Sequence, residues 1–473
     1  MSARFPDIQA EAPERREEWR FTALVIIAGV ALRLYWLARS HGRLFGMPTA
    51  GEAYRAALSV ARHGVLGDAY FVGQGPSAHL LPVNPMIAGG VLWAFGPGSV
   101  AANVALLAWA AVQVVGGYLL VRALFRQLGA SAAVQRWGIV LLLLVPSFVP
   151  QEVIEFRYWE GGSAVCLAAI NLLMIVRLDE RRSLDTRALL AAAGLSAITF
   201  FISPSAGLAV DLCWAVVALR RLSFLRAAQF GIASALALTL LIVPWAIRNE
   251  RALGETVLLR SNFGLEFAMA NHDAALSDGP RPPAYVYHDR FDKIHPGDQN
   301  SGLQPLIKQR GAEVRYSRAL ARQTEAWVAA HPWGFARLCL RHFHEFFFPE
   351  PWQMYFTEWE GLRTPRSVAI SLVDLLGLIG LTLGLFSDRR RYWIPLLYIF
   401  AVAVPYSLFQ PVSRYIFLVY PMLAFGAIEG ICRLAAAMGR SRKSGRDGLQ
   451  VTRAAMSCDQ HSWVRARLAP MLP

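Results

Sequence analysis

Acidic residues beside apolar segments are the first residues of this sequence that could do chemistry. Glu52 begins a run with apolar residues at helical spacing, and Glu155 and Glu160 belong to a stretch, 151–160, that holds three acids beside aromatic residues. A carboxylate at a boundary between water and hydrocarbon is partly desolvated, so its pKa can rise toward the range in which it deprotonates a hydroxyl or an amine. Glu52 is therefore a candidate general base, the alternative being that it complements a helix N-terminus.

Two of these carboxylates could also work together. Glu52 and Glu160 could share a proton, orient an acceptor or hold a divalent cation, and the alternative for the acidic stretch is solvation at an interface. The five cysteines have no CxxC or metal-ligand spacing. The sequence therefore identifies no certain cofactor and leaves only a divalent cation open.

Three arginines are candidates for binding a phosphate group. Arg248, Arg260 and Arg414 adjoin apolar segments, and a guanidinium matches phosphate oxygens by paired hydrogen bonds. In a phosphate site they would stabilise negative charge that develops on the phosphate oxygens. The alternative for each is an arginine that snorkels from an apolar helix to the interface.

The composition indicates a membrane protein. Of 473 residues, 55% are hydrophobic and 17% are charged, which is too apolar for an ordinary soluble protein. The net charge of +14 does not indicate a nucleic-acid partner, because the arginines recur between apolar segments and do not gather in one patch. Membrane lipids are the expected surroundings.

Apolar runs long enough to cross a bilayer predict about ten transmembrane helices. They lie near 21–38, 100–121, 137–150, 161–176, 188–202, 205–219, 228–247, 367–386, 392–409 and 415–432. One set of alternate loops holds thirteen arginines and the other only Arg157 and Arg414, and positive residues resist translocation. Both termini are therefore expected in the cytoplasm.

The predicted organisation has five parts. A cytoplasmic tail, 1–20, is followed by helices one to seven over 21–247, which include an outer loop at 39–99. A large outer domain covers 248–366, helices eight to ten cover 367–435, and a basic tail covers 436–473. Within the outer domain, residues 272–310 read as a lid-like loop. Chemistry is expected on the outer side of the membrane.

Two groups of motifs carry a resemblance to a known family. The first lies in the outer loop, at 52–57 (EAYRAA), 64–68 (GVLGD), 75–79 (GPSAH) and 82–85 (PVNP). The second lies where a span meets the large outer domain, at 244–249 (PWAIRN) and 259–266 (LRSNFGLE). Together with weaker matches, such as Arg414-Tyr415, they resemble bacterial GT-C glycosyltransferases of the protein O-mannosyltransferase and aminoarabinose-transferase superfamily.

This resemblance implies a fold, an activity and a set of site residues. The fold would be all-α and GT-C-like, with a mainly α outer domain. The activity would be inverting transfer of a sugar from a polyprenyl-phosphate carrier, such as undecaprenyl phosphate, to an acceptor glycan, lipid or protein on the periplasmic face of a bacterial inner membrane. Glu52 would be the base, supported by Glu160 and Glu155, and the three arginines would bind the lipid phosphate. The residues expected to bind substrate are Arg55, His79, Asn262, Glu266, Asn271, His331 and Tyr415.

Two other functions remain open on the sequence. A transporter or flippase for a lipid-linked sugar would also need a polytopic bundle with cationic groups, but it predicts acids deep in the spans, whereas the acids singled out here cluster in outer loops, apart from Asp211 in the sixth span. A glycan polymerase or ligase would use outer arginines and a large outer loop. The Glu52 loop favours the transferase.

Overall fold

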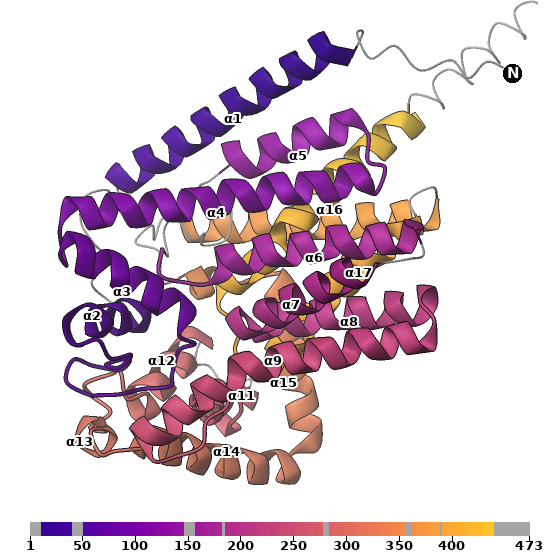
Figure 1. The fold of residues 1–473 in the computed structure, drawn as a ribbon. Coiled ribbons are helices and arrows are strands. Elements are labelled where there is room, and N and C mark those ends of the chain that lie inside the picture. Colours follow the sequence, from indigo (N-terminus) through magenta and orange to yellow (C-terminus); the bar gives the residue numbers. More distant parts are fainter. Residues whose placement is uncertain are drawn as a thin grey trace, which may run out of the picture.

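The computed structural model describes residues 11–39, 51–145, 157–181, 185–277, 283–354, 362–387 and 390–438. Within these residues the chain is helical, and the only β-type pairing is an isolated bridge between Gly67 and Pro76. The predicted all-α, polytopic architecture is therefore confirmed for this part of the chain (Figure 1).

Six of the described helices are long and apolar enough to cross a membrane. They are α1 (Glu11–Arg39, apolar from Arg16), α4 (Val100–Gln127), α6 (Gly161–Arg181), α9 (Phe224–Leu253), α16 (Arg363–Phe386) and a C-terminal helix, Tyr420–Met438. Shorter helices lie among them: α3 (Val83–Phe95), α5 (Ala132–Leu144), α7 (Thr186–Ile202), α8 (Pro204–Arg221) and α17 (Trp393–Tyr406). By length and composition the described helices thus provide six spans, fewer than the ten predicted.

Two predicted spans have different bounds in the structure. The span expected near 137–150 is α5, which begins earlier and ends at Leu144. The span expected near 415–432 begins as a short 3-10 helix, η5 (Ser413–Leu418), and continues as the C-terminal helix. A polar side chain starts several of the helices, as Ser99 does when its hydroxyl accepts a hydrogen bond from the Ala102 amide at 3.0 Å.

Small residues and buried polar contacts hold the long helices together. A Cβ added to Gly380 would lie 1.9 Å from the carbonyl oxygen of Gly426, so α16 and the C-terminal helix pack backbone against backbone. On the other side of the bundle, the buried Arg33 of α1 donates hydrogen bonds to the carbonyls of Leu142 and Leu143, the last residues of α5. Carbonyls at the C-terminal end of a helix have no amide partner within that helix, and the Arg33 guanidinium provides the missing hydrogen-bond donors.

The remaining helices lie together at one end of the long ones. They are α2 (Glu52–His63), α10 (Phe263–Ala270), α11 (Asp273–Leu276), α12 (Pro283–Ile294), α13 (Gln304–Ile307), α14 (Ala312–Ala330) and α15 (Pro332–Phe347). In Figure 1, α2 lies beside α3 at this end, and α12, α13 and α14 lie below them. The interpretation of 272–310 as an irregular lid-like loop is wrong for its described part, which contains three helices.

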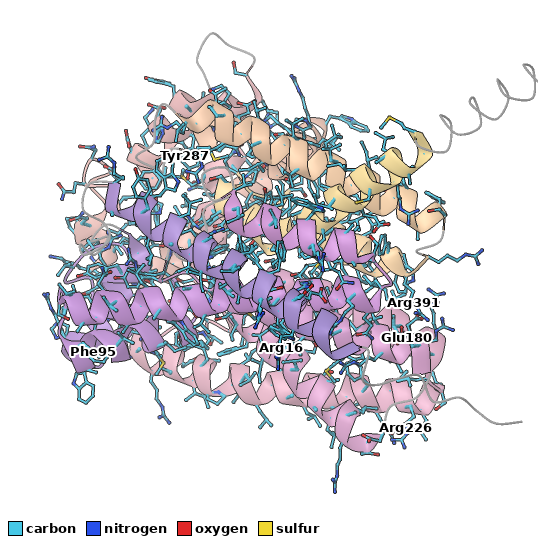
Figure 2. The ribbon with its side chains drawn as sticks, turned by 90° about the horizontal axis from the view of Figure 1, so that it is seen from above. Arg16, Phe95, Glu180, Arg226, Tyr287 and Arg391 are labelled. Atoms are coloured by element: carbon cyan, nitrogen blue, oxygen red, sulfur yellow. The ribbon has the colours of Figure 1, made fainter. Side chains whose placement is uncertain are left out.

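The two ends of the bundle carry the two predicted sets of loops. Figure 2 places Glu180, Arg226 and Arg391 toward one end, and Phe95 and Tyr287 toward the opposite end. Arg226 and Arg391 belong to the arginine-rich loops predicted to be cytoplasmic. The end with α2 and α12 is the one predicted to face outward, and the candidate site lies there.

Candidate functional site

Helix α2 places Glu52 at the start of its first turn. The helix buries Ala56, Ala57 and Leu58, and it packs closely on α3, where a Cβ on Gly89 would lie 2.5 Å from the Val60 side chain. The fixed helix leaves the Glu52 side chain about 30% exposed. This carboxylate is therefore held in place and still open to an incoming molecule.

Two histidines and a tyrosine surround this carboxylate. Nε2 of His79 lies 2.7 Å from Oε2 of Glu52, and Nε2 of His295 lies 3.3 Å from Oε1. The other ring nitrogen of His79, Nδ1, is 3.0 Å from the hydroxyl of Tyr70. Phe291 stacks on the His295 ring with centroids 4.1 Å apart, so α12 fixes this second imidazole. We call these four residues, Tyr70, His79, Glu52 and His295, the carboxylate cluster.

The pKa of Glu52 corrects an expectation. Desolvation by burial acts to raise it, as predicted, but the charge of His79 and the hydrogen bonds from His295 and His79 outweigh desolvation and hold the pKa of Glu52 well below 4.5. Burial alone would lower the pKa of His79, yet the neighbouring Glu52 raises it above 6.5. The cluster therefore holds a carboxylate that is ionised near neutral pH, and this carboxylate stabilises the protonated form of His79.

Glu313 on α14 holds the loop that carries His79. Its buried carboxylate accepts hydrogen bonds from the Ala78 amide at 2.7 Å, from Nε2 of Gln74 at 2.7 Å and from the Ser261 hydroxyl at 2.9 Å. Three donors to one carboxylate make a rigid connection between the first outer loop and the outer domain. Glu313 thus fixes the backbone next to His79.

Arg248 supports the same loop from α9. Its guanidinium donates hydrogen bonds to the backbone carbonyls of Ser77, at 2.8 Å, and Leu66, and to the side chain of Asn249 at 3.0 Å. Arg248 was predicted to bind the lipid phosphate. The structure instead gives its guanidinium protein partners that fix the loop.

The other two predicted arginines lie in a second group of charged and aromatic side chains. Arg260 forms an ion pair with Glu160, and both act electrostatically on Tyr415. The guanidinium of Arg414 lies 5.1 Å from the centre of the Tyr415 ring and 6.0 Å from that of Trp159. We call Glu160, Arg260, Arg414 and Tyr415 the arginine cluster. It brings together four residues singled out from the sequence.

Glu266 connects the two clusters. Burial and other charges have larger effects on the pKa values of Tyr70, His79 and Tyr415. The carboxylate of Glu266 acts to raise all three. Asn262 donates a hydrogen bond to Glu266 at 3.3 Å. Helix α10, which carries Glu266, lies beside the carboxylate cluster, because Tyr70 packs in one apolar cluster with Leu265 and Met269 of this helix, and Arg260 comes three residues before the helix begins.

The other predicted site residues have separate positions. Nε of Arg55 donates to the Ala69 carbonyl at 3.0 Å, and this side chain is close enough to Glu52 to feel its charge. Asn271 donates to the carbonyls of Phe267 and Leu408, each at 2.9 Å, which joins α10 to the end of α17. His331 is exposed at the end of α14 and stacks on Trp327, away from both clusters. Glu155 lies outside the described residues.

Metal binding finds no ready site in the described part of the chain. Among those residues, no group of three or more His, Cys, Asp or Glu is arranged to hold a metal ion. Glu52, His79 and His295 come nearest to forming such a group. Their facing atoms already contact one another, because Nε2 of His79 lies against Oε2 of Glu52 and Nε2 of His295 lies against Oε1. Glu160 meets Arg260 rather than a second carboxylate.

Three residues of the site were not identified from the sequence. Tyr70 and His295 complete the carboxylate cluster, and Glu313 holds its loop. The turn-forming run His295-Pro296-Gly297 was a usable signal for His295, since polar side chains in defined turns often line sites. Glu313 lies in a weaker match to the same family, at 311–313 (GAE), but was not singled out as a site residue, and Tyr70 carried no local signal.

Comparisons with known proteins complete the description. No family model matches this chain, and no curated protein sequence matches it. Three solved structures of the Archaeoglobus fulgidus oligosaccharyltransferase are similar to it. The apo form is 13% identical with a TM-score of 0.49, and the alignment covers 90% of this chain and 51% of that one.

The other two structures contain bound molecules. The complex of the archaeal enzyme, AglB, with an inhibitory peptide and a dolichol-phosphate is 14% identical, with a TM-score of 0.48 and coverage of 91% and 52%. The complex with zinc and sulfate is 12% identical, with a TM-score of 0.47 and coverage of 88% and 49%. This chain spans about half the length of these archaeal chains, and its site is argued from its own residues.

Proposed function

We propose that this protein is a GT-C-type membrane glycosyltransferase that moves a sugar from a polyprenyl-phosphate carrier to an acceptor. The observation that carries the proposal is that the carboxylate cluster and the arginine cluster are neighbours. The partly exposed Glu52 carboxylate belongs to the cluster that packs on α10 through Tyr70, and the arginine cluster includes Arg260, three residues before that helix. A base for the acceptor and cations for a phosphate leaving group are the two requirements of this reaction.

Glu52 is the proposed base. The acceptor's oxygen or nitrogen attacks the anomeric carbon of the sugar, the bond from that carbon to the phosphate oxygen breaks, and the acceptor proton passes to Glu52. A low pKa makes Glu52 a weak base, but the acceptor proton becomes strongly acidic as the new bond forms. His79 and His295 keep the carboxylate charged and oriented until that point.

Arg260 and Arg414 are the proposed phosphate ligands. The phosphate gains negative charge as the sugar leaves, and guanidinium groups already in position stabilise that charge without reorganising. Glu160 holds Arg260 in position through their ion pair. Tyr415 and Trp159 flank Arg414 with their rings, which restrict the orientation of its guanidinium.

We further propose the setting in which the reaction takes place. The arginine-rich end of the bundle faces the cytoplasm of a bacterial cell, and the two clusters face the periplasm across the inner membrane. Undecaprenyl phosphate is the proposed carrier, and a glycan, lipid or protein is the acceptor. The five-part division of the chain, from the tail at 1–20 to the tail at 436–473, belongs to this proposal.

The test is a transfer assay in membranes with a panel of radiolabelled polyprenyl-phosphate sugars. Glu52→Gln keeps the shape of the side chain and removes the base, so transfer should fall by about 10²–10⁴-fold. Glu325→Gln, the same change at an exposed position of α14, is the matched control. Full activity of the Glu52 variant would overturn the role given to this residue.

Movement of a lipid-linked sugar across the membrane is the second candidate function. Asp374 of α16 favours it, because its carboxylate is fully buried inside a span and neither oxygen has a hydrogen-bond partner among the described residues. Acids within spans are typical of transport pathways. A flippase would move the labelled lipid between leaflets of proteoliposomes without forming a glycosylated product, and a polymerase or ligase would differ in the size of that product.

A further inference from the structure

The described part of the chain contains a cavity far from the two clusters. It has a volume of about 400 Å³ and lies between α7, α8 and α9. Its lining on α9 runs from Phe224 at the start of the helix to Leu238, so it occupies the half of the bundle that begins at the arginine-rich end. The proposed transfer reaction uses none of its residues.

One acid lines this otherwise apolar cavity. Asp211 of α8 accepts a hydrogen bond from the hydroxyl of Ser196 on α7. On the α9 side, the buried hydroxyl oxygen of Ser234 has no hydrogen-bond partner among the described residues. A carboxylate within a membrane-spanning bundle is costly and usually meets a cation or a hydrogen-bond donor. Here a single hydroxyl is the contact seen.

The depth of Asp211 limits what could meet it. The residue lies ten positions before Arg221, the end of α8, and at 1.5 Å per residue this is roughly 15 Å, or half of a bilayer core about 30 Å thick. The acyl chain of a lipid offers only methylene groups at this depth. A transmembrane helix can place a polar side chain there.

The wall formed by α9 is open and made of small residues. Only 11% of the 18-residue apolar segment of α9 is buried, against 28% to 61% of the corresponding segments in the other five long helices. Ala227, Gly231 and Ala235 repeat every four residues along the cavity, and a Cβ added to Gly231 would meet no atom within 4 Å. Small residues at this spacing let a second helix approach closely.

We propose that this groove receives a transmembrane helix of a partner protein that carries a lysine or an arginine at mid-span. The partner's small or flexible side chains pack on α9, and its cationic group enters the cavity to meet Asp211, with Ser234 as a further acceptor. A second copy of this chain is a poorer occupant, because the same face would bring a second carboxylate to Asp211. The inference is independent of the proposed transfer activity.

The probes are two synthetic transmembrane peptides. One is a fluorescent leucine-alanine helix with a single lysine at its centre, and the other has leucine at that position. Binding is measured by energy transfer to the labelled full-length protein in liposomes. The lysine peptide should bind wild type about tenfold more tightly than the leucine peptide.

Three variants test the site. Asp211→Asn should abolish the preference for lysine, and Gly231→Leu, which fills open space in the groove, should weaken both peptides. Gly194→Leu is the matched control, because Gly194 on α7 also has open space around it but does not line the cavity. Circular dichroism and thermal unfolding confirm that each variant is folded.

Several results would overturn the proposal. Equal binding of the two peptides would point to a groove for acyl chains. An unchanged lysine preference in Asp211→Asn would remove the role of the carboxylate. Energy transfer between two labelled copies of this chain, lost in Gly231→Leu but kept in Gly194→Leu, would assign the groove to self-association instead.

Discussion

Nε2 of His79 lies 2.7 Å from Oε2 of Glu52, and this contact joins two residues that are 27 positions apart in the chain. It explains why a carboxylate at the edge of a membrane bundle has a lowered pKa. The contact also makes the stability of the outer loop depend on pH, since each partner must be charged for the pair to reach full strength.

The first prediction concerns this pH dependence. The pKa of Glu52 is lowered below 4.5, so its contribution to stability is present above pH 4.5 and is lost as the pH falls through the lowered value. The pKa of His79 is raised above 6.5, so its contribution is complete below pH 6.5 and is lost as the pH rises through the raised value. The difference in Tm between wild type and His79→Gln should therefore be greatest between pH 4.5 and 6.5. A difference that grows steadily toward pH 9 would contradict the pairing.

The second prediction concerns Glu313. Glu313→Ala leaves three buried donors without their acceptor, and each such group costs about 1–3 kcal/mol. We expect a clear loss of thermal stability, and we expect Glu313→Gln, which keeps the shape, to lower kcat while KM for the lipid donor changes little. Glu325→Ala on the exposed face of the same helix is the control. A matching rise in donor KM would instead place Glu313 at the donor site.

The third prediction concerns Arg260. Arg260→Gln removes a cation proposed to stabilise the leaving phosphate, so kcat/KM should fall by about 10²–10³-fold. Arg260→Lys keeps the charge and loses the paired hydrogen-bond geometry, and its activity should be intermediate. Arg310→Gln, on an exposed side chain that donates to backbone carbonyls, is the comparison. If the lysine variant were as impaired as the glutamine variant, geometry and not charge would be the contribution of Arg260.

The fourth prediction concerns Arg33. Its guanidinium is buried between α1 and α5 and supplies the last carbonyls of α5. Arg33→Leu should destabilise the protein by about 1.5–3 kcal/mol, the range for hydrogen bonds to charged groups. Arg39→Leu, at the exposed end of the same helix, should have little effect. Equal unfolding temperatures for the two variants would show that the Arg33 contacts do not hold α1 to α5.

Some features of the site follow directly from the sequence. Apolar runs identified the long helices, because most side chains that face hydrocarbon are apolar whatever their neighbours are. Glu52 could be selected in the same way, since an acid at the start of an amphipathic outer helix is a local pattern. Arg260, Glu160, Arg414 and Tyr415 were each selected locally, and the structure places them in one cluster.

Tertiary structure decided how these groups behave. The expected rise in the pKa of Glu52 rested on desolvation, which a sequence can suggest, whereas the pKa is lowered by two histidines that other elements bring to the carboxylate. Arg248 and Arg260 are both arginines in a similar setting in the sequence. The Arg248 guanidinium donates hydrogen bonds to backbone carbonyls, whereas Arg260 forms an ion pair with the carboxylate of Glu160. Periodicity determines which face of a helix is buried. The partner of a polar side chain depends on contacts between distant parts of the chain, and only the folded structure contains them.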